Sequence, residues 1–237
     1  MTIACISDLH GYLPIYPSKY WEGIEKCELL LICGDIIPLY IQFDNTASKK
    51  WLLNDFLTWA NSLPVNKILF IAGNHDQVME RDDSWMHKNF SKCTKVTYLK
   101  NELYTYINCY GKEYKIFGTP YCHQFGNWSF MYSNEVLKEK FSKIPKDLDI
   151  LITHDPPTLG EVGVILDKRN WNYRKQCGNQ ILTEVILNVT PKYVFSGHIH
   201  SGDHQLCDIE NIKLANVSVV DELYNMTYKP LVYEINH

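Results

Sequence analysis

The stretch IACISDLH, residues 3–10, joins a short apolar run to two side chains that can bind metal ions. The run Ile3–Ser7 is too short for a helix, and such runs are typical of buried strands in α/β proteins. Side chains alternate along an extended segment, so Asp8 and His10 are expected to face one way while Leu9 faces the core. The stretch therefore predicts a buried strand that ends in a pair of ligands.

The same junction recurs after other apolar runs. Four further predicted strands are each followed by Asp, Asn or His: Leu29–Cys33 by Asp35, Ile68–Ala72 by Asn74, His75 and Asp76, Asp149–Thr153 by His154, and Tyr193–Ser196 by His198 and His200. Because the functional crevice of an α/β sheet lies at the carboxyl ends of its strands, these side chains are expected to converge. Gly34, Gly73 and Gly197 each precede a candidate ligand and are expected to permit tight turns there.

Helical patterns lie between several of these strands. The clearest spans Ala47–Leu63, where the apolar residues form one stripe and Pro64 follows. Two more are expected at Asn134–Ile144, with Ser133 as the N-cap, and at Asn179–Asn188. Helices that alternate with buried strands predict βαβ units and therefore the α/β class.

Two other stretches favour antiparallel pairing. Leu103–Phe117 is typical of a hairpin that turns around Gly111. Gln205–Ile235 is typical of two strands joined by a turn at Asp208–Asn211, followed by a last strand at Leu231–Ile235. The sheets are therefore expected to be mixed.

Composition limits the partners of the protein. A chain of 237 residues that is 46% hydrophobic can bury one large core, so a single domain over residues 1–237 is expected. The net charge of −4 gives no basic surplus, so neither a nucleic-acid backbone nor a membrane surface is expected as a partner. The longest apolar runs are far shorter than a membrane span.

The cysteines indicate a reducing compartment. None of the eight forms a Cys-x-x-Cys pair, and Cys5 and Cys33 interrupt apolar runs, so buried free thiols are expected rather than disulfides. The first residues have neither a basic segment nor a long apolar one that would form a cleaved leader. A cytoplasmic location is therefore expected.

The ligand types limit the metal. Two Asp, one Asn and four His without a thiolate favour Mn²⁺, Fe²⁺, Zn²⁺, Ni²⁺ or Mg²⁺ over a calcium cage or a structural zinc site. Seven ligands exceed what one tetrahedral ion uses, whereas two ions about 3.5–4 Å apart with one bridging carboxylate fit the number. Each motif alone could be a polar turn rich in histidine. Their combination after five predicted strands favours the metal site.

The pattern D-x-H, G-D, G-N-H-D, H, G-H-x-H, met in order over residues 8–200, resembles the calcineurin-like binuclear metallophosphoesterases. Residues 116–121, 125–130, 153–157 and 214–218 are similar to the metallophosphoesterase-domain (MPPED) subgroup. The resemblance implies an α/β fold with two mixed β-sheets packed face to face as a sandwich and flanked by helices, in four layers.

The resemblance also implies a role for each residue of the motifs. One ion would be held by Asp8, His10, Asp35 and His200, and the other by Asp35, Asn74, His154 and His198, with Asp35 as the bridge. Manganese is the first expectation for both ions. His75 would lie beside the reacting phosphate as an electrophile or proton donor, and Asp76 would orient it.

The implied activity is a metal-dependent phosphodiesterase that hydrolyses cyclic nucleotides or other small phosphodiesters. A hydroxide that bridges the two ions would attack phosphorus, so no cysteine or serine need act as a nucleophile. A phosphomonoesterase or protein phosphatase is an alternative, although Gly34-Asp35-Ile36-Ile37 lacks the acidic and arginine residues that protein phosphatases carry there. A catalytically silent binding scaffold is another, although all eight motif positions are filled.

Two histidines outside the motifs stay open. His123 lies in a loop with Trp128 and Phe130, which either pack locally or form a platform for a nucleobase. His204 follows the last motif and is either a further ligand or a histidine that faces solvent or supports a ligand.

Overall fold

Two mixed β-sheets form the centre of the structure, a computed structural model that describes residues 1–235. The first sheet has the strand order β13-β1-β2-β3-β4, and the second has the order β11-β12-β10-β9-β6-β5. The strands of the first are β1 (Thr2–Ile6), β2 (Leu29–Cys33), β3 (Lys67–Ile71), β4 (Val96–Tyr98) and β13 (Leu231–Glu234). Those of the second are β5 (Glu102–Ile107), β6 (Glu113–Thr119), β9 (Ile150–Thr153), β10 (Tyr193–Ser196), β11 (Cys207–Ile209) and β12 (Ile212–Asn216).

The central strands of both sheets are parallel, and antiparallel strands lie at the edges. β1 to β4 pair in parallel, whereas β13 joins β1 antiparallel. In the second sheet β6, β9, β10 and β12 are parallel, and β5 and β11 are antiparallel edges. The expected hairpin is confirmed, because β5 and β6 pair antiparallel on either side of Gly111, which has a φ of 79°.

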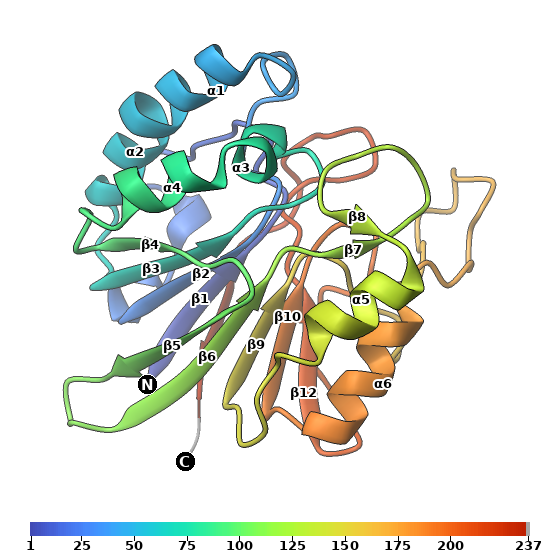
Figure 1. The fold of residues 1–237 in the computed structure, drawn as a ribbon. Coiled ribbons are helices and arrows are strands. Elements are labelled where there is room, and N and C mark those ends of the chain that lie inside the picture. Colours follow the sequence, from blue (N-terminus) through green and yellow to red (C-terminus); the bar gives the residue numbers. More distant parts are fainter. Residues whose placement is uncertain (236–237) are drawn as a thin grey trace.

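The two sheets pack face to face, and helices cover their outer faces (Figure 1). Alternate residues of each central strand, such as Ile3 and Leu31 in the first sheet and Ile150 and Phe195 in the second, form one buried cluster between the sheets. The intervening residues belong to a second cluster with the helices. Strands buried on both faces explain why the sequence shows unbroken apolar runs. The expected α/β sandwich of two mixed sheets flanked by helices is confirmed.

Helices α1 to α4 lie over the first sheet, and α5 and α6 lie over the second (Figure 1). Their bounds are α1 (Asn45–Trp51), α2 (Leu57–Ser62), α3 (Gln77–Arg81), α4 (Asp83–Phe90), α5 (Asn134–Phe141) and α6 (Gln180–Val189). Two 3₁₀ turns, Lys19–Trp21 and Ile24–Lys26, lie between β1 and β2. The short strands β7 (Cys122–His123) and β8 (Met131–Tyr132) form a separate pair.

The expected helix over Ala47–Leu63 differs in detail from the structure. It begins earlier, at Asn45, because the Asp44 carboxylate accepts hydrogen bonds from the backbone of Thr46 and Ala47. A π-helical segment, Leu52–Phe56, separates α1 from α2. The apolar stripe still faces the core, because Phe56 and Trp59 are buried.

The caps of the other expected helices differ from each other. Ser133 occupies the N-cap position of α5, as expected, but its side chain makes no capping hydrogen bond. Asn179 caps α6 by accepting from the backbone N–H of Leu182 at 3.0 Å.

Disulfides are absent from the described residues, as expected, because all eight cysteines are free. Four of them are buried, and Cys109 is exposed, so the expectation of buried thiols holds for only part of the set. No helix within residues 1–235 combines the length and apolar character of a membrane span. The cytoplasmic location stays a prediction.

Phe70 on β3 tests the packing of helices on the first sheet. Its ring lies 5.0 Å from Phe90 and 5.3 Å from Phe56 between ring centroids, and it is fully buried. We expect Phe70→Ala to lower the free energy of unfolding by about 3–5 kcal/mol, because it leaves a cavity. Urea denaturation measures the change. The control is Leu187→Ala, since Leu187 is 44% exposed on α6; equal losses in the two variants would contradict this view of the core.

Candidate metal centre

The carboxyl ends of β1, β2, β3, β9 and β10 meet where the two sheets come together, and the motif residues follow these ends. A parallel bridge between Ser7 and Ser218 connects the sheets at this edge. Ser7 Oγ donates to the Cys33 carbonyl at 2.9 Å, and Gly197 N–H donates to the His154 carbonyl at 3.1 Å. The predicted convergence of residues from both ends of the chain is confirmed.

Several candidate ligands lie on turns of left-handed backbone rather than on extended segments. The φ angles are 58° at Asp8, 43° at His10, 51° at Asp35 and 67° at His198. Asp8 and His10 do face the same group of donor atoms while Leu9 is buried in the core, as expected, but a left-handed turn and not an extended segment produces this arrangement. The turns after β1 and β2 are joined by backbone hydrogen bonds, including one from His10 N–H to the Asp35 carbonyl at 2.9 Å.

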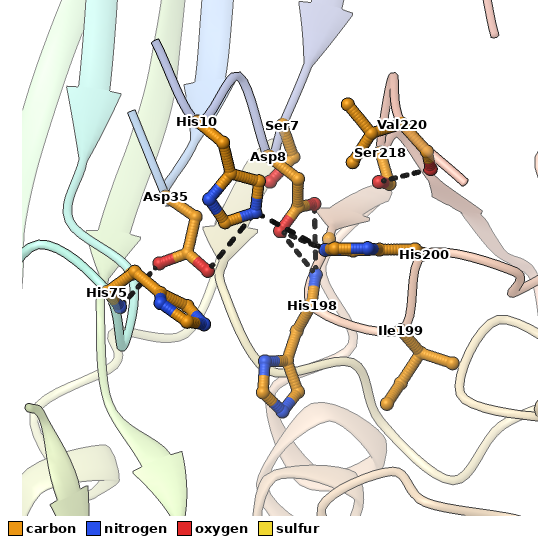
Figure 2. A network of polar contacts seen from close by, with 12 residues as sticks. Ser7, Asp8, His10, Asp35, His75, His198, Ile199, His200, Ser218 and Val220 are labelled. Carbon is orange, nitrogen blue, oxygen red and sulfur yellow. Dashed lines mark hydrogen bonds and ion pairs between the residues drawn. The ribbon is translucent and has the colours of Figure 1, made fainter. Parts of the chain in front are cut away.

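Asp8, His10 and His200 form one compact group of donor atoms (Figure 2). The Nε2 atoms of His10 and His200 are 3.4 Å apart, and His200 Nε2 lies 3.5 Å from Asp8 Oδ1. Asp35 Oδ2 is 3.9 Å from His10 Nε2. His200 Nδ1 faces the Asp221 carbonyl at 3.1 Å, which fixes the hydrogen on Nδ1 and leaves the Nε2 lone pair toward the group. These donors fit a divalent cation.

Asp35, Asn74 and His154 form a second group of donor atoms. His154 Nε2 lies 3.3 Å from Asp35 Oδ2 and 2.9 Å from Asn74 Oδ1. His154 Nδ1 faces the Cys33 carbonyl at 2.8 Å, so in the neutral ring an Nε2 lone pair points at two oxygens. Either a proton or a cation must relieve that repulsion. Burial lowers the pKa of His154, but the charge and hydrogen bond of Asp35 outweigh it and raise the pKa to about 10.

His198 contacts the centre mainly through its backbone. Its N–H donates to both carboxylate oxygens of Asp8, at 3.2 and 3.1 Å. Figure 2 shows its imidazole turned away from Asp8. The ring centroid lies 5.0 Å from that of His154. The His198 ring is therefore next to the second group.

The carboxylates of Asp8 and Asp35 are both buried and both ionised. Burial raises their pKa, but His200 beside Asp8 and His154 beside Asp35 outweigh this effect and hold both pKa values below the usual range. Two buried negative charges so close to one another require cations between or beside them. The chemistry of the donors thus fits a pair of divalent ions.

Glycines permit the close approach of these turns. A Cβ on Gly73 would overlap the Asp35 carboxylate, and a Cβ on Gly197 would overlap Ser7 Oγ and the Asp8 carboxylate. Gly34 has a φ of 97°, which disfavours any other residue. The roles expected for these glycines agree with the structure.

His75 and Asp76 have different surroundings from those expected. The His75 ring lies 4.5 Å from the Trp128 ring, and its Nδ1 is 2.7 Å from Gln42 Oε1. Gln42 is buried, and its Nε2 donates to the Leu39 carbonyl at 3.0 Å, which fixes the orientation of the amide. Thus Gln42, not Asp76, orients the His75 ring.

The Asp76 carboxylate instead connects the turns after β2 and β3. It accepts from the backbone N–H groups of Gly73 at 2.8 Å, Ile37 at 2.9 Å and Ile36 at 3.0 Å. Burial and the charge of Asp35 raise its pKa to about 7 despite these hydrogen bonds. The expectation that Asp76 orients His75 is therefore corrected.

A cavity of about 300 Å³, the metal cavity, opens in front of the donor groups. Its walls include Glu222, Tyr224, Trp128 and Phe125, of which only Trp128 was a candidate from the sequence, as part of a platform for a nucleobase. The Tyr224 ring lies 4.8 Å from His10 and 5.0 Å from His200. No local pattern distinguishes Glu222 and Tyr224, because they reach the cavity from a loop.

Neither of the two open histidines belongs to the donor groups. His204 Nε2 lies 3.1 Å from the His200 carbonyl, and its ring stacks on Tyr228 at 3.7 Å. Of the two alternatives for His204, the structure agrees with support of a ligand. His123 Nδ1 contacts Asp155 Oδ2 at 2.8 Å, away from the donor groups.

Comparison with known proteins agrees with this geometry. The family model described as calcineurin-like phosphoesterase matches residues 1–202. Metallophosphoesterase domain-containing protein 1 of Homo sapiens is 27% identical over 98% of this chain and 70% of its own. UPF0046 protein C25E10.12 of Caenorhabditis elegans is 26% identical over 98% of this chain and 79% of its own.

Solved structures share the fold. The phosphopantetheinyl hydrolase of Mycobacterium tuberculosis superposes with a TM-score of 0.55 at 14% identity, over 94% of this chain and 90% of that one. The match of the family model over most of the chain, together with the sandwich fold, shows that this protein belongs to the calcineurin-like phosphoesterase family.

Proposed function

We propose that this protein is a phosphodiesterase that hydrolyses small phosphodiesters, cyclic nucleotides among them. Family membership supports the broader activity of a metal-dependent phosphoesterase. The observation that carries the proposal is the pair of buried, ionised carboxylates, Asp8 and Asp35, with imidazoles around them at the end of an open cavity. Such a site is suited to bind two cations and an anionic ester together.

Each donor group would hold one divalent ion. Asp8, His10, Asp35 and His200 would bind the first, and Asp35, Asn74, His154 and His198 the second, with Asp35 shared. When bound, the ions would lower the pKa of a water molecule and offset the charge of the phosphate oxygens. Oxygen and imidazole donors without a thiolate support manganese, with iron, zinc, nickel and magnesium as alternatives.

His75 would deliver a proton to the departing oxygen. Because the Gln42 amide presents Oε1 to His75, Nδ1 keeps its hydrogen, and the doubly protonated ring would deliver the proton carried on Nε2, at the edge left for the cavity. Trp128 packs against the ring and limits its rotation. Gln42 would thus act as a positioning residue for a general acid.

The walls of the metal cavity support a diester rather than a monoester. None of the described residues that line it is Lys or Arg, and Glu222 adds a negative charge. A monoester dianion carries one more charge than a diester, so Glu222 disfavours it more strongly. Trp128, Phe125 and Tyr224 offer apolar surface for a second organic group. The two alternative functions that experiments can distinguish from this one are a phosphomonoesterase and a catalytically silent scaffold.

The substrate class can be tested with chromogenic esters. With Mn²⁺, we expect kcat/KM for bis-p-nitrophenyl phosphate to exceed that for p-nitrophenyl phosphate by about tenfold, which corresponds to about 1.4 kcal/mol. A panel of 2′,3′- and 3′,5′-cyclic nucleotides, followed by chromatography, tests the finer proposal. Preference for the monoester would favour a phosphomonoesterase, and no turnover of any ester would favour a scaffold.

The bridging role of Asp35 predicts a loss of metal. We expect Asp35→Asn to bind at most one ion per chain, where the unchanged protein binds about two. Elemental analysis after dialysis gives the stoichiometry, and circular dichroism checks the fold. The matched control is Asp208→Asn, because the Asp208 carboxylate is exposed and pairs with Lys213 at 2.7 Å. Retention of both ions by Asp35→Asn would refute the bridge.

The role of Gln42 predicts a dependence on the leaving group. We expect Gln42→Leu to lower kcat for methyl phenyl phosphate by about 10- to 100-fold, because a poor leaving group needs a positioned acid. The loss for methyl p-nitrophenyl phosphate should be smaller, and Gln42→Glu, which keeps an oxygen beside Nδ1, should recover part of the activity. Equal losses for both esters, at unchanged metal content, would mean that Gln42 has only a structural role.

A further inference from the structure

A second cavity, of about 360 Å³, adjoins the metal cavity. Phe125 and His198 line both cavities. The Phe125 side chain is 55% exposed, and its ring lies 5.2 Å from that of His198. An ester bound at the metal centre can therefore extend past Phe125 into the second cavity.

The side chains that line the two cavities differ in charge. Asp35 and Glu222 line the metal cavity, whereas no Asp or Glu is among the described residues that line the second. Lys175 lies in the wall of the second cavity, is exposed, and forms no ion pair within residues 1–235. The neighbouring Arg174 is already paired with Glu161. Lys175 is therefore a cation available to a ligand.

His123 is a second group in the same wall that can bind an anion, and the buried Asp155 beside it favours its protonated form. The buried Asp155 carboxylate, through Oδ2, receives the backbone N–H and the ring Nδ1 of His123, both at 2.8 Å, and Asn179 Nδ2 at 2.9 Å. Burial lowers the pKa of His123, but its hydrogen bond to Asp155 and that charge outweigh it and raise the pKa. With Nδ1 turned to Asp155, the edge of the ring that carries Nε2 is the one left for the cavity.

The loop that carries Lys175 is fixed by its backbone. Ile165 N–H donates to the Lys175 carbonyl at 3.0 Å, and Cys177 N–H donates to the Gly163 carbonyl at 2.7 Å. A bridge between Val164 and Gln176 lies between these bonds. The wall is therefore formed before a ligand binds, which lowers the entropic cost of binding.

We propose that the second cavity binds a carboxylate or phosphate group on the organic part of the phosphodiester, with Lys175 and His123 as its partners. Phe125 and Ile199 pack against the carbon atoms that connect this group to the ester. The proposal rests on the phosphodiesterase function and narrows its substrates to diesters with a second acidic group. A charge-assisted hydrogen bond from Lys175 and a hydrogen bond from His123 would then select the substrate.

Matched esters test this selection. The test series consists of p-nitrophenyl carboxyalkyl phosphates whose alkyl chains increase in length. Each carboxylate ester is compared with the neutral carboxamide ester of the same chain length, which has nearly the same shape. At the best chain length, we expect KM for the carboxylate to be about fivefold lower than for the carboxamide, as for a partly exposed ion pair. Lys175→Met and His123→Asn should each reduce this ratio, and the double variant should bring it to about one. Phosphonoalkyl esters rank phosphate against carboxylate.

Methyl p-nitrophenyl phosphate serves as the internal reference. It does not reach the second cavity, so its kcat/KM should be unchanged in both variants. Lys138→Met, which removes an exposed lysine of α5 that lines neither cavity, should change no ratio.

The possible results separate the two proposals. Hydrolysis of the methyl ester with equal KM for carboxylate and carboxamide at every length rejects the second cavity as an anion site and leaves the function intact. The anion site is also rejected if the double variant still prefers the carboxylate over the carboxamide. It is rejected as well if phenylalkyl esters bind more strongly than the carboxylate esters. No hydrolysis of any diester rejects the proposed function and with it the substrate class.

Discussion

The mutual repulsion of Asp8 and Asp35 is the constraint on which the rest of the site depends. Both carboxylates are buried at the ends of adjacent parallel strands, where removal from water costs several kcal/mol for each ion. The protein offsets this with backbone donors, because His198 N–H binds Asp8 and His75 N–H binds Asp35 at 2.8 Å. The imidazoles of His200, beside Asp8, and His154, beside Asp35, also stabilise the two carboxylates. The left-handed turns at both aspartates persist because these bonds hold them in place.

The parts of the fold that follow from buried periodicity could be predicted from the sequence. β1, β2 and β10 are buried on both faces, so each is an unbroken apolar run that ends at a polar turn. α3 and α4 were not predicted, because their sequences are short and polar, and the cap of α4 by Asp82 is visible only once the helix is known. β4 has three residues and depends on pairing with β3.

The positions of the candidate ligands could be predicted because each follows a strand. Their backbone conformations could not be predicted. The turn at Asp8 is set by a hydrogen bond from its N–H to the Gly34 carbonyl, a contact between separate strands. Asp76 is next to His75 in sequence, but its carboxylate faces the turn after β2. Gln42 lies 33 residues from His75 in sequence and contacts it through loop packing. Such contacts are tertiary and leave no local pattern.

The difference between the side chains of the two cavities follows from which part of the fold forms each wall. The strand ends supply the acidic metal centre, and they are constrained by the sandwich that they terminate. The loops at residues 122–130 and 163–178 supply Phe125, His123 and Lys175, and they pack outside the sheets. Loops can change without loss of the core, so substrate choice can vary while Asp8 and Asp35 stay fixed. Under the proposed function, specificity would therefore depend on the loops, and the chemistry on the strand ends.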